Sequence, residues 1–416
     1  ELWVTDGTSA GTVVIDIVPG TGNSSPGQFR TVNGKTLFRA YTPSEGDEVW
    51  TTDGSAAGTA LFKAIYPGSN SSGPQLASGE LLGGELYFAA ADATAGNELW
   101  KTDGTPAGTV FVVDILPGTS SSFPRELCAV GNTLYIAANQ SELFAWSTAG
   151  LLKLRPFDNV TFKDLQVCGS KLFFWGNDPV AGLEPFVSDG TVQGTVMLKD
   201  IAAGGSSRAT SGSFATDIGG GRCIFVASDG TSPPARGAEL WTTDGSAAGT
   251  QLLLDIEPGV STGNAINSLF LNCWGSTLFF WANDGSGTTG EEPYLWSRGG
   301  GCRLLADLAP GAASSSAPFE ATSCGDRLYF VASTPASGRE LVISDGTSAG
   351  TKIHDLNPGT SSSSPGNLTV WNNRLYFVAN DGTSGHEVHV ADPATGSVQL
   401  LKDVYPGFNT GVRPAS

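Results

Sequence analysis

One motif recurs along the whole sequence at intervals of about 48 residues. A glutamate opens each copy, and in six copies a loop with the pattern Asp-Gly-(Thr/Ser)-x-x-Gly-Thr follows, at residues 1–12, 48–59, 98–109, 184–195, 239–250 and 340–351. Three other copies keep the glutamate and lose the loop, at Glu142, Glu292 and Glu387. Self-similarity at this period is typical of repeat architectures, so we expect the chain to fold as a series of equivalent units.

Each repeat contains four short runs, as residues 318–359 illustrate. The second run, 327–333, is the most hydrophobic, and the third run opens with the glutamate at 340. The runs are short and bounded by Gly, Asn, Asp, Ser or Pro, which indicates strands rather than helices. The 56 glycines and 23 prolines agree with strands and turns, because helices tolerate both residues poorly.

Four strands per unit, repeated eight times, predict an all-β fold: a β-propeller of about eight four-stranded blades. A β-solenoid is the competing architecture, but its rungs are shorter and lack hairpin turns at fixed positions. The expected blades cover residues 28–68, 75–118, 124–157, 164–204, 213–259, 266–311, 318–359 and 367–407.

Residues 1–20 contain only the third and fourth runs of a repeat. They are predicted to form an extra two-stranded half-blade before an eight-bladed propeller at 21–416. This half-blade either docks beside the final blade or belongs to a preceding propeller of a longer chain. The chain starts within a motif and without a basic or apolar leader, which favours a fragment or processed product and gives no sign of a targeting segment.

The balance of charge restricts the partners that we expect. The chain has 40 acidic and 22 basic residues and a net charge of −18. Such a surface repels nucleic acid and anionic membranes, so neither is expected as a partner. No run of about 18 apolar residues occurs, and membrane insertion is not expected.

The aspartates of the six complete loops are weak candidates for a metal site: Asp6, Asp53, Asp103, Asp189, Asp244 and Asp345. In a hairpin between the third and fourth strands, such a carboxylate can accept backbone N–H bonds while the next glycine adopts φ > 0. Calcium needs about six to eight oxygen ligands, more than one aspartate per loop supplies. We therefore favour a structural role and expect no cofactor, with calcium as the alternative.

The repeated glutamates are expected to accept hydrogen bonds from loop amides of their own or the next blade. The alternative is a ring of carboxylates that binds cations or a basic partner. Because the decayed copies keep the glutamate, we expect it to matter more to the blade than the loop does.

Six cysteines occur, at Cys128, Cys168, Cys223, Cys273, Cys302 and Cys324. None forms a C-x-x-C pair, so a zinc or redox motif is not expected. We predict sequential disulfides, 128–168, 223–273 and 302–324, because neighbouring blades touch, with reduced core cysteines as the alternative. An even count in a chain of this composition favours an oxidising, extracellular compartment.

Five Asn-x-Ser/Thr sequons are candidate glycosylation sites: Asn23, Asn70, Asn139, Asn159 and Asn367. About three or four would arise by chance in this composition, so the count alone is weak support for a glycoprotein. Asn23 and Asn70 lie in equivalent connectors and are the first candidates if a eukaryotic cell secretes the chain.

No catalytic constellation stands out in the sequence. We find no nucleophile elbow, phosphate loop or dinucleotide fingerprint, and the arginines follow no repeat position. The chain is therefore predicted not to be an enzyme. A glycan-active enzyme that uses paired carboxylates is kept as an alternative function.

The copies ELWVTDGT, ELWKTDGT and ELWTTDGS resemble the family named for its ELWxxDGT repeat, and the hairpin is similar to the Asp-box hairpin of other propellers. The resemblance covers essentially the whole chain. It implies an extracellular or cell-surface protein with a structural or adhesive role, as one unit of a larger surface protein or filament. The implied partners are other proteins, surface polysaccharide or further copies in a longer chain, and the resemblance brings no active site with it. A carbohydrate-binding, lectin-like propeller is the alternative.

Overall fold

The computed structural model describes residues 1–20, 22–139, 142–156, 165–208, 215–230, 237–257, 266–311 and 315–404. Within these ranges the chain is all-β and contains no helix, and so no helix long and apolar enough to cross a membrane. The chain divides into two compact units, Glu1–Lys199 and Asp200–Ser416, each of which is described by itself.

The first unit contains a two-stranded sheet followed by four four-stranded sheets, which we call blades 1 to 4. The two-stranded sheet consists of β1 (Leu2–Val4) and β2 (Val13–Ile15). Blade 1 consists of β3 (Gly27–Val32), β4 (Lys35–Thr42), β5 (Gly46–Thr52) and β6 (Ala60–Lys63), and blade 2 of β7 (Glu80–Leu82), β8 (Glu85–Asp92), β9 (Gly96–Thr102) and β10 (Val110–Val113). Blade 3 consists of β11 (Glu126–Val130), β12 (Thr133–Ala138), β13 (Glu142–Ser147) and β14 (Gly150–Pro156), and blade 4 of β15 (Gln166–Cys168), β16 (Lys171–Asp178), β17 (Gly182–Ser188) and β18 (Val196–Met197).

The second unit contains four more four-stranded sheets, blades 5 to 8. Blade 5 consists of β19 (Thr216–Asp217), β20 (Cys223–Ser228), β21 (Ala238–Thr243) and β22 (Gln251–Leu254), and blade 6 of β23 (Ile266–Trp274), β24 (Thr277–Ala282), β25 (Glu292–Ser297) and β26 (Gly301–Leu304). Blade 7 consists of β27 (Phe319–Cys324), β28 (Arg327–Thr334), β29 (Gly338–Ser344) and β30 (Lys352–His354), and blade 8 of β31 (Gly366–Trp371), β32 (Arg374–Asn380), β33 (His386–Ala391) and β34 (Val398–Lys402).

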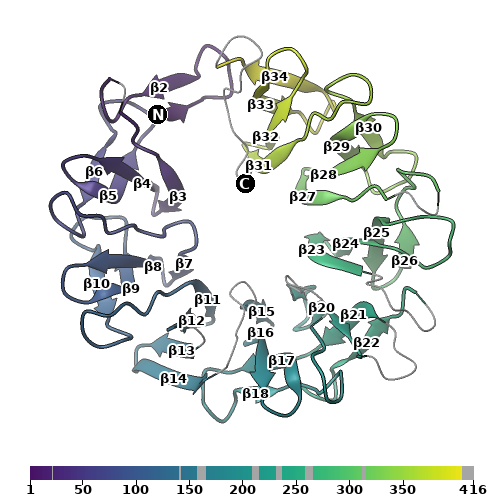
Figure 1. Cartoon of the computed structure of the whole chain (residues 1–416), viewed down its shortest axis with the longest axis horizontal. Helices are drawn as coiled ribbons and strands as arrows, with labels where there is room; N and C mark the ends of the chain where they lie inside the picture. The colour runs from purple at the N-terminus through teal and green to yellow at the C-terminus, as the bar shows by residue number, and fades with distance from the viewer. Residues whose placement is uncertain are drawn as a thin grey trace. The chain divides into compact units, whose positions relative to one another are not determined.

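Every blade is an antiparallel meander in which the four strands pair in chain order (Figure 1). The predicted β-propeller of eight four-stranded blades is confirmed. The meander places the turns between strands 1 and 2 and between strands 3 and 4 at one end of the blade, which we call the hairpin end. The turn between strands 2 and 3 and the connector to the next blade lie at the other end, which we call the latch end.

The hydrophobic core lies between successive blades. One cluster joins Val32 and Val49 of blade 1 to Leu86, Phe88 and Trp100 of blade 2. The second strands are buried on both faces, which is why their sequences are continuously apolar. A blade therefore buries its two faces only when it has neighbours on both sides.

The β1–β2 hairpin packs against blade 1. Leu2 and Ile15 are buried with Phe38 and Ala40 of β4. These two strands form a sheet of their own, and their assignment as the third and fourth strands of a repeat stays a prediction. The division of the chain at residue 20 stays a prediction.

Candidate functional site

The hairpin between the third and fourth strands is built around its aspartate. In blade 7, Oδ1 of Asp345 accepts hydrogen bonds from Thr347 N at 2.9 Å and Thr347 Oγ1 at 2.7 Å. The Thr347 hydroxyl oxygen in turn accepts a bond from Gly350 N at 3.0 Å. The other five complete loops repeat this pattern at Asp6, Asp53, Asp103, Asp189 and Asp244.

Steric crowding explains why the second glycine position of each loop carries no side chain. A Cβ on Gly350 would lie 2.0 Å from Oδ1 of Asp345, and the same close approach occurs at the matching glycine of all six loops. The hydroxyl and amide of Thr347 lower the pKa of Asp345 from its usual 3.8. The carboxylate is therefore ionised at neutral pH and locked onto its own loop.

The structure does not bring these candidate metal ligands together. Each of the six aspartates stands alone in its own hairpin, and its Oδ2 accepts no hydrogen bond from any residue that the structure describes. In the same residues, no group of three or more His, Cys, Asp or Glu side chains could hold a metal ion. The calcium alternative stays a prediction.

The repeated glutamate forms a buried latch on the connector to the next blade. Oε2 of Glu98 accepts bonds from Ile115 N at 2.8 Å and Ser122 Oγ at 2.6 Å, and Oε1 accepts one from Ser122 N at 2.6 Å. Glu98 is fully buried, and burial raises the pKa of its carboxyl, a shift that the hydrogen bonds from Ser122 and Ile115 oppose. The predicted bonding of the glutamate to loop amides is confirmed.

The same latch recurs in both units. Glu48 binds Ile65, Tyr66 and Ser72, and Glu340 binds Leu356 and Ser363. Glu239 accepts a bond from Ile256 N, and burial raises its pKa to about 8.

One part of the latch, its serine partner, was not recognised in the sequence. The buried serine partner lies 24 residues after Glu48 and Glu98, and 23 after Glu340, within connectors whose Ser-rich composition hides it. The signal was the spacing of 23 or 24 residues from the glutamate. Among the described residues, the carboxylate of the decayed copy at Glu142 binds Asn139 and Lys153. Most of the connector that follows this blade, residues 157–164, lies outside the described part of the chain.

The cysteines do not pair in sequence order, and the predicted disulfides 128–168, 223–273 and 302–324 are wrong. Cys168 and Cys223 are disulfide-bonded, whereas the other four cysteines, Cys128, Cys273, Cys302 and Cys324, are free. Cys302 lies on the fourth strand of blade 6 and Cys324 ends the first strand of blade 7, at opposite edges of their sheets, too far apart for a disulfide. Cys128 is buried in an apolar cluster, and the Sγ of Cys273 contacts Asp217 O.

We expect a thiol titration to give two distinct counts. In denaturant without reductant, Ellman's reagent should detect four thiols per chain, the four free cysteines. After reduction it should detect all six. In the native state Cys128 and Cys302 should not react, because burial raises their pKa values to about 12 and about 11. Six thiols before reduction, or none, would contradict this assignment.

The sequons occupy different environments. Asn23, Asn70 and Asn367 are exposed, while Asn139 is half-buried and donates to Glu142. Asn159 lies outside the described residues. Ser72, the hydroxyl residue of the Asn70 sequon, is also the latch partner of Glu48, so the blade itself needs that serine. Glycosylation stays a prediction.

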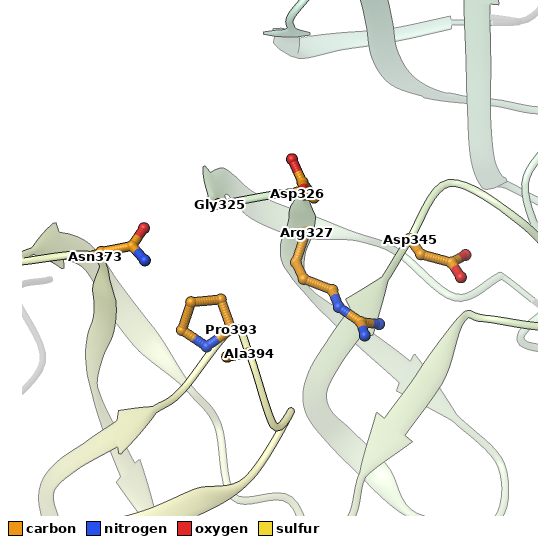
Figure 2. Close-up of a pocket in the computed structure, with 7 residues that line it drawn as sticks. All are labelled: Gly325, Asp326, Arg327, Asp345, Asn373, Pro393 and Ala394. Carbon is orange, nitrogen blue, oxygen red and sulfur yellow. The ribbon is translucent and has the colours of Figure 1, made fainter.

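A pocket of about 410 Å³ lies at the hairpin end between blades 7 and 8. It is lined by Gly325, Asp326, Arg327, Asp345, Asn373, Pro393 and Ala394. Figure 2 shows the Asn373 amide and the Pro393 ring on one side, and Arg327 and Asp345 on the other. This pocket brings Asp345, one of the six loop aspartates, together with the guanidinium of Arg327 and the amide of Asn373.

No family model and no curated protein matches this chain. Among solved structures, the computationally designed Ika8 protein is similar to it with a TM-score of 0.46 and 15% identity, over 89% of this chain and 96% of that one. Puromycin hydrolase matches with a TM-score of 0.37 and 15% identity, over 90% of this chain and 61% of its own. BamB from Moraxella catarrhalis matches with a TM-score of 0.36 and 13% identity, over 87% of this chain and 95% of its own. Likenesses this distant concern the fold alone.

The prediction that the chain is not an enzyme is contradicted by these comparisons. Puromycin hydrolase is among the solved structures that match. The exclusion rested on absent sequence motifs, and catalytic groups on a propeller can come from loops distant in sequence. The prediction that the chain is not an enzyme is therefore withdrawn.

Proposed function

We propose that this chain is a β-propeller interaction scaffold that works outside the cell or on its surface, as a member of the ELWxxDGT-repeat proteins. The observation that carries the proposal is the hairpin end of the blades. Each complete loop ties its own polar groups together and leaves Oδ2 of the ionised aspartate without a hydrogen bond from any described residue. The aspartate is exposed in five of the six loops and half-buried in the sixth, at Asp103. A rigid loop of this kind can bind a partner with little loss of conformational entropy.

Two further features support an extracellular setting. Disulfide-bonded Cys168 and Cys223 suit an oxidising compartment, because cytosolic thiols are normally kept reduced. The exposed sequons at Asn23 and Asn70 are placed where an attached glycan would meet solvent. The partner is another protein or a surface polysaccharide.

The two ends of a blade can be compared directly by photo-crosslinking. Ala57 is exposed in a hairpin-end loop of blade 1, and Val180, 88% exposed, lies in a latch-end turn of blade 4. A benzophenone amino acid replaces either residue in the full chain, and intact cells of the source organism are irradiated. We expect a crosslinked adduct from Ala57 and none from Val180, together with labelling of the chain by a membrane-impermeant biotin reagent.

Each part of the proposal can fail separately. Biotin labelling only after cell lysis would overturn the extracellular location. Equal crosslinking from both positions, or from neither, would overturn the hairpin end as the contact surface.

A further inference from the structure

The junction that holds the pocket between blades 7 and 8 can be compared with the junction between blades 1 and 2, which a side chain bridges. Glycine holds the bridging position in blade 7, as it does in blades 2, 3, 4 and 6. Between blades 1 and 2, Nδ2 of Asn33 donates to Gly84 O at 3.1 Å and to Asp103 O at 2.9 Å, which closes the junction. The strand registers place Gly325 at the position of Asn33, because Val32 pairs with Lys35 as Cys324 pairs with Arg327. Gly325 has no side chain to bridge the two blades.

A second closure is also missing. Between blades 6 and 7, the Trp274 ring lies over Gly346, and Nη2 of Arg303 donates to Gly346 O at 2.5 Å. The position of Trp274 is occupied in blade 7 by Cys324, since both residues end the first strand of their blade. The pocket has a volume of about 410 Å³, which falls within the usual range for small-molecule sites.

The groups around the pocket carry both donors and acceptors. The guanidinium of Arg327 lines the pocket and offers N–H donors, and, after the hydrogen bonds from Thr347, its charge helps to lower the pKa of Asp345. Oδ2 of Asp345 offers an acceptor, and the Asn373 amide offers one of each. Pro393 adds an apolar surface.

This combination disfavours a charged ligand. An anion on Arg327 would face the carboxylates of Asp326 and Asp345, on a chain whose net charge is −18. A cation between those carboxylates would face the guanidinium. Vicinal hydroxyls satisfy both kinds of group, because each hydroxyl donates and accepts, and the planar guanidinium and carboxylate can each bind two of them at once.

We propose that this pocket binds a neutral saccharide. Arg327 and Asp345 bind neighbouring hydroxyls from one side, Asn373 binds from the other, and Pro393 contacts the sugar ring. The inference deepens the proposed interaction role and rests on it for its biological meaning, but the binding itself is a property of the isolated chain.

Gly325→Asn is a variant that closes the pocket and preserves the backbone. Gly325 has φ +58°, and Asn33 holds the same left-handed conformation at φ +47°. A Cβ on Gly325 would lie 3.6 Å from Pro393 Cβ and 3.8 Å from Asn373 Oδ1, which are ordinary contacts. The matched control is Gly83→Asn, at the same turn position in blade 2, with φ +62° and nothing within 4 Å of an added Cβ.

The binding experiment uses the purified full chain and isothermal titration calorimetry. The probes are the methyl glycosides of glucose, galactose, mannose and N-acetylglucosamine, with lactose and cellobiose, and with tetralysine and citrate as charged ligands. We expect at least one neutral saccharide to bind, with affinity lowered about tenfold or more by Gly325→Asn and by Arg327→Gln, and unchanged by Gly83→Asn.

Three results would overturn the proposal: no binding of any neutral saccharide in the panel, binding that survives Gly325→Asn and Arg327→Gln, or binding of tetralysine or citrate only. Saccharide binding without surface labelling of the chain would leave the pocket intact and reject the extracellular role. Surface labelling without saccharide binding would reject the saccharide pocket and leave the extracellular location intact.

Discussion

Replacing Glu98 by alanine should lower the free energy of unfolding by about 3–4 kcal/mol. The variant removes the acceptor for three hydrogen bonds, two from Ser122 and one from Ile115 N. Because Glu98 and Ser122 are fully buried, water does not replace the carboxylate without opening the connector between blades 2 and 3. The free energy of unfolding falls further because the connector attaches one blade to the next, and the core between the blades depends on that attachment.

Urea unfolding of the full chain, followed by tryptophan fluorescence, measures this effect. Glu142→Ala is the matched control, since Glu142 holds the same repeat position and, among the described residues, binds only Asn139 and the half-exposed Lys153. It should cost less than about 1 kcal/mol. Equal losses in the two variants would show that the latch does not stabilise the blades.

The local structure of the repeat follows almost entirely from sequence. The DGT hairpin, the apolar second strand and the eight four-stranded sheets depend on contacts within about 50 residues. The hairpin recurs in six copies, and the four-stranded sheet recurs in every blade. The glutamate was also recognised from its presence in the decayed copies. Its serine partner was not, because Ser122 stands in a connector where serine is common and only the spacing marks it.

Features that depend on the contacts of one particular junction did not follow from sequence. The cysteine pairing failed because it assumed that neighbours in sequence are neighbours in space, whereas Cys302 and Cys324 lie on opposite edges of their sheets. The pocket was not foreseen either. Its lining residues come from two turns of blade 7 and two turns of blade 8, and only the structure shows that these turns meet.

Gly350→Ala should destabilise blade 7 by about 2–3 kcal/mol, because the added methyl group would lie 2.0 Å from Oδ1 of Asp345. The carboxylate cannot move away without losing both of its bonds to Thr347. The loop therefore has to open. Gly299→Ala is the control, because Gly299 occupies the corresponding hairpin of the decayed blade 6 and has nothing within 4 Å of an added Cβ.

A double-mutant cycle separates this steric conflict from a general intolerance of alanine in the loop. Asp345→Ala removes the carboxylate and makes room for the methyl group, so the double variant Asp345→Ala, Gly350→Ala should unfold at the same urea concentration as Asp345→Ala alone. Strong coupling of this kind is expected only for groups in direct contact. If the two effects simply add, the glycine of the motif serves backbone conformation alone. Coupling would instead show that Asp345 and Gly350 act as one unit, which explains why every complete copy of the repeat contains both.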